Sequence, residues 1–232
     1  MIQKKGKRRS TAASMPGNPA SSRNLPSITL PRPTRGRDTS VLRALKQRKT
    51  IREISDKPLS AQALSNLLWA ACGVNRTIGP FGIPGRTAAS ASNSQEIDLY
   101  VALREGIYLF NAVHHRLDPV VAGDLRALAI SHGQANLAAK APVRLIYIAD
   151  VNKLANTSGY QEPGLRDPEI QKSYYYADTG LIAGNVYLFA TSQGLASWFH
   201  NCNKSGLAAK LNLRADQRIL FGQTVGYPEK NS

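Results

Sequence analysis

The stretch RKTIREISDKPLS, residues 48–60, does the most to decide what kind of fold this chain adopts. Its first five residues place three cations and a hydroxyl together, in Arg48, Lys49, Thr50 and Arg52. Guanidinium groups make paired hydrogen bonds to phosphate oxygens, and a hydroxyl adds a neutral donor, so the segment suits a phosphomonoester. Taken alone, a run of charge is more typical of a solvated face.

A second segment, ASASNSQ at residues 89–95, carries small polar side chains ahead of a predicted strand. Ser90, Asn93 and Gln95 offer hydroxyl and amide groups without bulk, as a flat polar ligand edge or a ribityl chain requires. Without other context, an ordinary turn rich in Ser and Asn is the favoured interpretation.

These segments, in this order, resemble the nitroreductase superfamily of flavoproteins over about residues 39–229. The resemblance also covers Ala177 to Gly180 with the helix that follows, the turn GLA at residues 194–196, and QTVGYP at residues 223–228. The helical stretch LLWAA, residues 67–71, is most similar to the azoline-dehydrogenase-like, or SagB-type, branch.

The resemblance implies an α+β fold, with a central, mostly antiparallel sheet flanked by helices and one long core helix. It implies FMN in a groove at a homodimer interface, with NAD(P)H as the reductant. The expected activity is hydride transfer through flavin N5 to a nitroaromatic, quinone or similar small-molecule acceptor, in a ping-pong cycle.

The same resemblance assigns roles to the first segment. Arg48 and Thr50, with Lys49 between them, are expected at the phosphate and ribityl end of FMN. Arg52 is expected near the pyrimidine edge of the flavin ring, where a cation stabilises the negative charge that gathers on reduction.

Further residues are implied at the ring end. Asn93, with Ser90 and Gln95 near it, is expected to bond the ring or the ribityl chain. The stretch from Trp198 to Cys202 is expected to pass beside flavin N5, but Asn201 and Cys202 stand where classical nitroreductases commonly have an acidic residue and a glycine. Cys202 is either a redox-sensitive neighbour of the flavin or, as is more usual for a free cysteine, simply buried.

The net charge of +15 is concentrated at the start of this 232-residue chain. Fourteen of the thirty Lys and Arg residues lie in residues 1–52, together with only one acidic residue, Asp38. Residues 1–37 contain no acid and several prolines, which predicts a basic disordered or surface-draped arm ahead of a domain at residues 38–232. No apolar run makes the arm a working signal peptide, so a cytoplasmic location is expected, with export possible if the true N-terminus carries a signal.

Two other functions stay open. One is a flavin-binding family member without turnover. The other is nucleic-acid binding through the basic arm, which is disfavoured because the body lacks basic stripes with interleaved aromatic residues. No membrane span is expected, since no apolar run reaches the ~18 residues that a span needs. No metal site is expected either, because two cysteines and four histidines show no ligand spacing.

Apolar periodicity and capping residues predict the following elements. Helices are expected after Ser40, after Ser60 as far as Gly73, and at residues 123–137, 168–193 and 205–211. Strands are expected at 97–103, 106–110, 116–121, 143–149, 195–199 and 218–225, with loops at 74–89 and 152–168. Because helices and strands do not alternate strictly, the order also favours an α+β fold.

Overall fold

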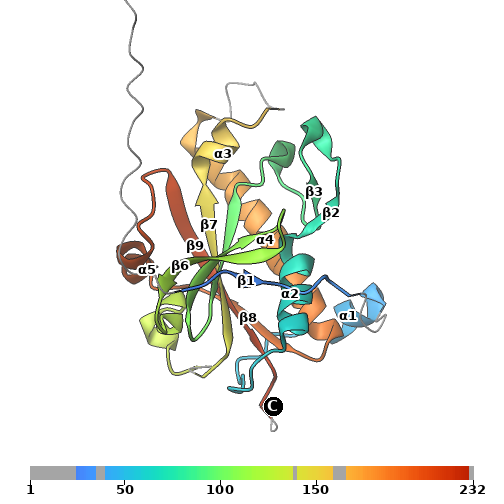
Figure 1. The fold of residues 1–232 in the computed structure, drawn as a ribbon, viewed down its shortest axis with the longest axis vertical. Coiled ribbons are helices and arrows are strands. Elements are labelled where there is room, and N and C mark those ends of the chain that lie inside the picture. Colours follow the sequence, from blue (N-terminus) through green and yellow to red (C-terminus); the bar gives the residue numbers. More distant parts are fainter. Residues whose placement is uncertain (1–24, 35–39, 138–139, 159–165, 230–232) are drawn as a thin grey trace, which may run out of the picture.

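A seven-stranded sheet lies at the centre of the computed structural model, which describes residues 25–34, 40–137, 140–158 and 166–229 (Figure 1). The strand order is β1-β6-β5-β4-β7-β9-β8, and every neighbouring pair is antiparallel. The strands are β1 (Ile28–Thr29), β4 (Ile97–Ala102), β5 (Gly106–Asn111), β6 (Arg116–Ala122), β7 (Val143–Asp150), β8 (Ala196–His200) and β9 (Gln217–Gly226). The predicted α+β class with an antiparallel sheet is confirmed.

The middle of the sheet follows directly from the apolar patterning. All eight residues of β7 are buried, because β4 and β9 pair with it on either side and helices or turns cover both faces. In β4, Leu99 and Val101 belong to one core cluster, whereas Tyr100 and Ala102 belong to the other. The alternation of side chains along a strand thus divides the interior into two cores.

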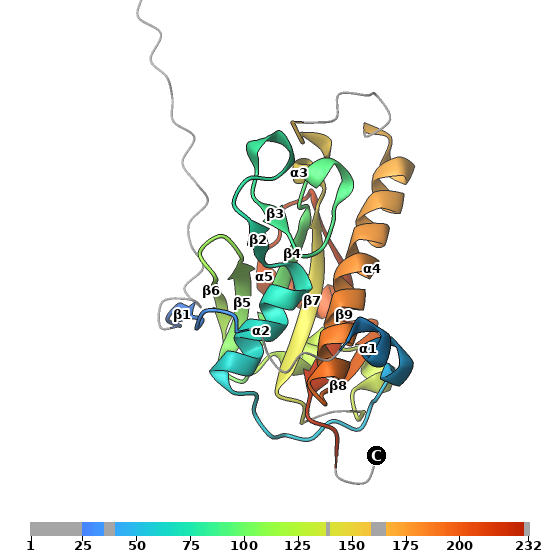
Figure 2. The same ribbon diagram turned by 90° about the vertical axis from the view of Figure 1, so that its right-hand side faces the viewer.

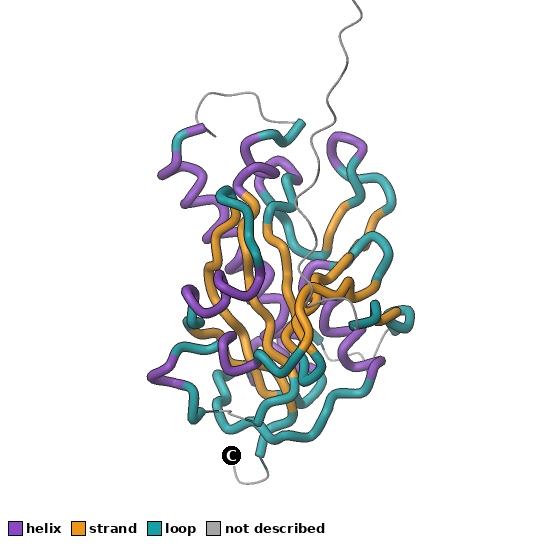
Figure 3. The backbone as a smooth tube through the Cα atoms, turned by 60° about the vertical axis from the view of Figure 1, so that its left-hand side comes forward, coloured by secondary structure: helices purple, strands orange, loops and turns teal. Residues whose placement is uncertain are grey.

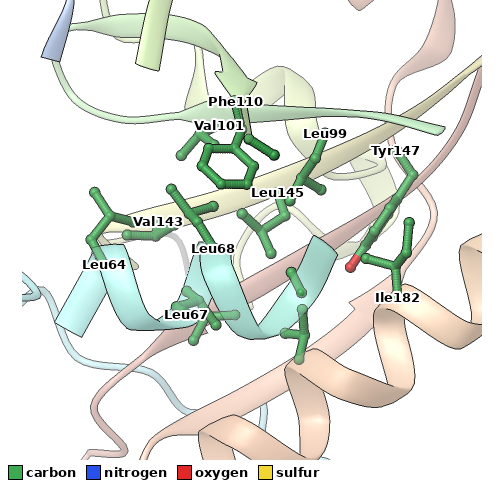
Figure 4. Close-up of a cluster of buried hydrophobic side chains, with 14 of the residues drawn as sticks. Leu64, Leu67, Leu68, Leu99, Val101, Phe110, Val143, Leu145, Tyr147 and Ile182 are labelled. Atoms are coloured by element: carbon green, nitrogen blue, oxygen red, sulfur yellow. The ribbon is translucent and has the colours of Figure 1, made fainter. Parts of the chain in front are cut away.

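Two helices cover one face of the sheet. They are α2 (Ala61–Cys72), whose N-cap Ser60 accepts from the Ala63 N–H, and α4 (Pro168–Ser192), which Asp167 caps. Leu64, Leu67 and Leu68 of α2 recur at helical spacing and pack on the sheet (Figure 4). The short helix α1 (Val41–Gln47) packs on α4, and Ser40 caps it.

The opposite face is covered by α5 (Lys204–Leu211) and short 3₁₀ turns, so the sheet is enclosed from both sides (Figure 3). The predicted helix at residues 123–137 is wrong. This stretch forms two 3₁₀ turns, η3 (Arg126–Ala129) and η4 (His132–Gln134). The Arg126 guanidinium binds Asp124 locally and donates to the Ala141 carbonyl at 3.0 Å. The second contact is a tertiary one, of the kind that overrides the helix propensity of Ala and Leu.

Two predicted loops contain regular structure. Within residues 74–89, β2 (Val74–Arg76) and β3 (Gly85–Arg86) form a separate two-stranded sheet, with the turn η1 (Pro80–Gly82) between them. The loop expected at 152–168 instead starts with the helix α3 (Val151–Ala155), because the Asp150 side chain caps it. Sequence reasoning missed both because the elements are only two to five residues long.

Part of the basic N-terminal segment lies against the domain. Leu25 and Leu30 are buried, and β1 pairs with β6 through Ile28 and Thr29. Most of the predicted arm, residues 1–24 and 35–37, lies outside the described residues. The division at residue 37 therefore stays a prediction.

Candidate functional site

The cationic segment, defined here as residues 48–52, lies between α4 and the edge strand β8. The Ile51 N–H donates to the Ser197 carbonyl of β8 at 3.2 Å. The Thr50 Oγ1 is 3.2 Å from the hydroxyl of Tyr187 on α4. That hydroxyl also accepts the Phe199 N–H at 2.9 Å, so Tyr187 connects Thr50 to β8.

The charges of this segment have no counter-charge in the described part of the chain. Arg48, Lys49 and Arg52 are exposed, and none forms an ion pair with a described acid. The Arg48 guanidinium lies 5.5 Å from the Tyr187 ring centre, and that of Arg52 lies 5.5 Å from the Trp198 ring centre. Aromatic contacts thus orient two cations while leaving their charge available to an anion.

The C-terminal end of the domain lies beside this segment. The Ser55 N–H donates to the Tyr227 carbonyl at 2.9 Å, and the Glu229 N–H donates to the Glu53 carbonyl at 3.1 Å. An isolated bridge joins Ile54 to Pro228. The first and last stretches that carry the sequence resemblance are therefore neighbours in space.

The serine–asparagine segment, defined here as residues 89–95, has an unusual backbone. It contains the turn η2 (Ala91–Asn93), and Ser92, Asn93 and Gln95 have φ angles of 48°, 55° and 51°. Such conformations cost non-glycine residues of order 1 kcal/mol each and gather at functional sites. The Ser90 Oγ accepts the Gln95 N–H at 3.0 Å, which helps to hold this shape.

The amides of Asn93 and Gln95 make contacts within the chain. The Asn93 Nδ2 donates to the carbonyls of Pro80 and Ile83, both at 3.3 Å, and the Gln95 Nε2 donates to the Pro84 carbonyl at 2.7 Å. The Gln95 Oε1 accepts from the Arg86 Nε at 2.7 Å. These side chains tie the segment to the β2–β3 hairpin, and their expected contact with flavin stays a prediction.

Two acids fix the serine–asparagine segment to the domain. The Ala91 N–H donates to Asp178 Oδ2 of α4 at 2.9 Å, and the Ser94 hydroxyl donates to Glu96 Oε2 at 2.6 Å. Glu96 is completely buried, and its Oε1 makes no hydrogen bond in the described part of the chain. Burial first, and then the Asp178 carboxylate, raise the pKa of Glu96 to about 7.

Asn201 and Cys202 lie just beyond β8, and the structure places them differently from each other. Asn201 is exposed, and its carbonyl accepts the Ser131 N–H at 3.2 Å. Cys202 is buried in the core cluster on the face of the sheet opposite α2 and α4, and burial raises its pKa to about 11. This placement agrees with the simply buried alternative, and a flavin contact by either residue stays a prediction.

The two candidate segments contact α4 at different levels, one near its middle and one nearer its C-terminal end. The serine–asparagine segment contacts Asp178 and the cationic segment contacts Tyr187. Nine residues separate these two contacts, which corresponds to about 13 Å along a helix. Figure 2 shows α4 running from the end of the molecule that carries the β2–β3 hairpin to the end that carries α1.

Several residues at these sites escaped sequence reasoning. Tyr187 and Arg86 gave no local signal, because their partners lie 137 and 9 residues away in the chain. Asp178 lies within a stretch that carries the sequence resemblance, but it was assigned there to the helix and given no role in the site. Its contact with Ala91 spans 87 residues.

Comparison with known proteins identifies the family. The Nitroreductase family model matches residues 45–227, and the chain belongs to this family. A nitroreductase-family relative from Methanocaldococcus jannaschii, MJ1384, is 30% identical over 158 residues, which cover 65% of this chain and 73% of that protein.

Solved structures agree. A nitroreductase-type protein of Ralstonia eutropha, reut_a1228, is 32% identical with a TM-score of 0.75, covering 94% of this chain and 97% of that one. The Escherichia coli microcin synthetase McbBCD is 19% identical with a TM-score of 0.60, covering 94% of this chain and 84% of that one. At that identity, the second match shows the fold alone.

Two features are absent from the described residues. No helix in them is both long enough and apolar enough to cross a bilayer. They also contain no group of three or more His, Cys, Asp or Glu side chains arranged to hold a metal ion.

Proposed function

We propose that this protein is an FMN-dependent oxidoreductase that uses NAD(P)H to reduce a nitroaromatic, quinone or similar flat acceptor. Bound FMN would supply the hydride chemistry, taking a hydride from NAD(P)H and passing it to the acceptor. The observation that carries the proposal is the set of three exposed cations, Arg48, Lys49 and Arg52, with no acidic partner among the described residues.

The residues present fit the phosphate end of FMN. Arg48 supplies a planar donor set for phosphate oxygens, and Thr50 adds a hydroxyl that Tyr187 orients. Arg52 lies over Trp198, further along the same segment, where its charge would stabilise a reduced, anionic ring.

The serine–asparagine segment suits the ring end. Its strained backbone is held by Asp178, Gln95 and Asn93 in a fixed shape, so its exposed groups would meet a flat ring without reorganisation. We propose that each cofactor lies between two copies of the chain and touches segments from both, as the family resemblance implies.

An uncovered apolar face supports the dimer. Val41, Leu42 and Leu45 of α1 are 65%, 78% and 53% exposed, and Leu181 of α4 is 49% exposed. The helix face that carries Val41, Leu42 and Leu45 is turned away from the core. A second copy of the chain is the proposed partner, because the family is typically dimeric.

We also propose that the chain stands near the SagB-type branch. The LLWAA stretch supports this placement, and McbBCD shares the fold. Azoline oxidation is not part of the proposal, because the chain lacks a recognisable pair of catalytic Lys and Tyr residues.

A visible spectrum tests the proposal. The purified full chain, with and without added FMN, should show flavin absorbance that bleaches when NAD(P)H is added without oxygen. A colourless preparation that takes up no FMN would contradict the flavin assignment. Flavin that stays oxidised with both NADH and NADPH would favour a binding protein without turnover, and salt-dependent nucleic-acid binding that requires residues 1–37 would favour the third alternative.

A further inference from the structure

A cavity of about 300 Å³ lies between the sheet, α2 and α4, on the inner side of the serine–asparagine segment. Its floor is apolar and comes from three elements. Leu99 and Phe110 line it from the sheet and Ile182 from α4, and Figure 4 shows the three side chains in the same core cluster. A cavity of this size is at the lower end of the range for ligand pockets, so it suits a small ligand.

Arg86 lines this cavity and forms no ion pair with a described acid, although the Asp98 carboxylate lies near enough to raise its pKa. Its Nε donates to the Gln95 Oε1 at 2.7 Å and its Nη1 donates to the Cys72 carbonyl at 3.2 Å, so both partners are neutral. No acid in the described part of the chain forms an ion pair with it, and no described group accepts from its Nη2. Burial lowers the pKa of Arg86, and the nearby Cys72 and Asp98 offset this effect only in part.

The other charged groups that line the cavity are already engaged. Lys153 and Asp98 pair with each other at 2.5 Å. Asp178 accepts the Ala91 N–H at 2.9 Å and lies beside the buried Glu96. The Arg86 guanidinium, partly buried above the apolar floor, is therefore the charged group of this cavity that forms no ion pair with a described residue. A small anion with an apolar body would pair with it and fill the cavity.

We propose that this cavity binds a compact aromatic carboxylate, with the carboxylate on Arg86 and the ring on the floor formed by Leu99, Phe110 and Ile182. The site goes beyond the proposed function, because its occupation needs neither flavin nor turnover.

Calorimetric titration of the full chain with 4-nitrobenzoate and with nitrobenzene tests the site. The carboxylate should bind about tenfold or more tightly than the neutral ring, because a charge-assisted hydrogen bond is lost without it. Equal affinities, or no binding of 4-nitrobenzoate, would overturn the proposal.

Three variants assign the effect. Arg86→Gln should weaken 4-nitrobenzoate about tenfold or more and leave nitrobenzene unchanged, whereas the control Arg104→Gln, an exposed arginine between β4 and β5, should change neither. Ala112→Phe, which fills the floor without touching Arg86, should abolish binding of both. Melting curves separate lost binding from lost folding. If Arg86→Gln does not fold, comparing the affinities of the unsubstituted chain for 4-nitrobenzoate and nitrobenzene still tests the proposal.

A titration in the presence of FMN separates this cavity from the flavin site. Saturating FMN should leave the affinity for 4-nitrobenzoate within about twofold of its value without FMN. One-for-one displacement of 4-nitrobenzoate by FMN would overturn the proposal of a distinct site. If the chain takes up no FMN but binds 4-nitrobenzoate through Arg86, the proposed function alone is refuted.

Discussion

The hydroxyls of Thr50 and Tyr187 lie 3.2 Å apart although 137 residues separate them in the chain. Tyr187 also accepts the Phe199 N–H, so one phenol connects the cationic segment, α4 and the edge strand β8. The geometry of the candidate phosphate site therefore depends on a side chain that does not itself belong to it.

Removing that phenol should loosen the site. Tyr187→Phe leaves the Phe199 N–H without its acceptor and should lower the free energy of unfolding by about 1–3 kcal/mol. It should also weaken FMN retention, because Thr50 loses the partner that orients it. Denaturant unfolding and FMN titration measure the two effects. Tyr176→Phe, on an exposed part of the same helix, is the control, and equal behaviour of the two variants would show that Tyr187 does not position Thr50.

Arg48 should carry much of the affinity for the cofactor phosphate. Arg48→Ala removes a charge-assisted donor and should weaken FMN binding by about tenfold to a hundredfold, with little change in stability because Arg48 is exposed. Fluorescence titration with FMN and with riboflavin measures this. Riboflavin lacks the phosphate and should bind both proteins equally. An unchanged FMN affinity would remove Arg48 from the phosphate role.

Glu96 should make stability depend on pH. Its pKa is raised to about 7 in the fold, well above the ordinary value for a carboxyl group, so the folded state holds a proton that the unfolded state has released. Between about pH 4.5 and 7 the folded state binds more protons, and stability should fall as pH rises, by up to about 1.4 kcal/mol for each pH unit. Glu96→Gln should flatten this dependence in urea unfolding at pH 5, 6 and 7. A slope identical in both proteins would count against a protonated Glu96.

Both cysteines should be unreactive in the folded protein. Burial raises the pKa of Cys72 to about 12 and that of Cys202 to about 11, so at pH 8 neither is a thiolate, the reactive form. With Ellman's reagent, the two thiols should react slowly in native protein and at once in denaturant. A native-state burst of one thiol would place a cysteine in an accessible position.

The apolar face of α1 should hold the dimer together. Leu42→Asp places a charge on a side chain that is 78% exposed in the isolated chain, and should weaken association about tenfold or more. Analytical ultracentrifugation measures this, with Gln47→Asp at the end of the same helix as the control. A dimer as tight as the unsubstituted one would mean that α1 lies outside the interface.

Sequence reasoning recovered the elements whose signal is local. The unbroken apolar run at 143–149 is the buried core of β7, and Pro168 and Gly194 lie at the two ends of α4, as expected. It failed at 123–137, where Ala and Leu favour a helix but the contacts of Arg126 with Asp124 and Ala141 impose short turns.

The candidate site was predicted only in part, for a related reason. The polar segments themselves are visible in the sequence. Their partners are not, because the bonds from Ala91 to Asp178 and from Thr50 to Tyr187 join residues that no short pattern connects. The free donor of Arg86 also depends on which neighbours the fold brings near it.

The pairing of residues 53–55 with residues 227–229 sets an order of events during synthesis. The cationic segment leaves the ribosome early, yet it cannot settle between α4 and β8 until β9 and the residues after it have been made. Contacts this distant in the chain form late. A nascent chain that already contains every basic residue of the segment would therefore still be unable to retain the cofactor, and we expect loading with FMN to follow completion of the domain.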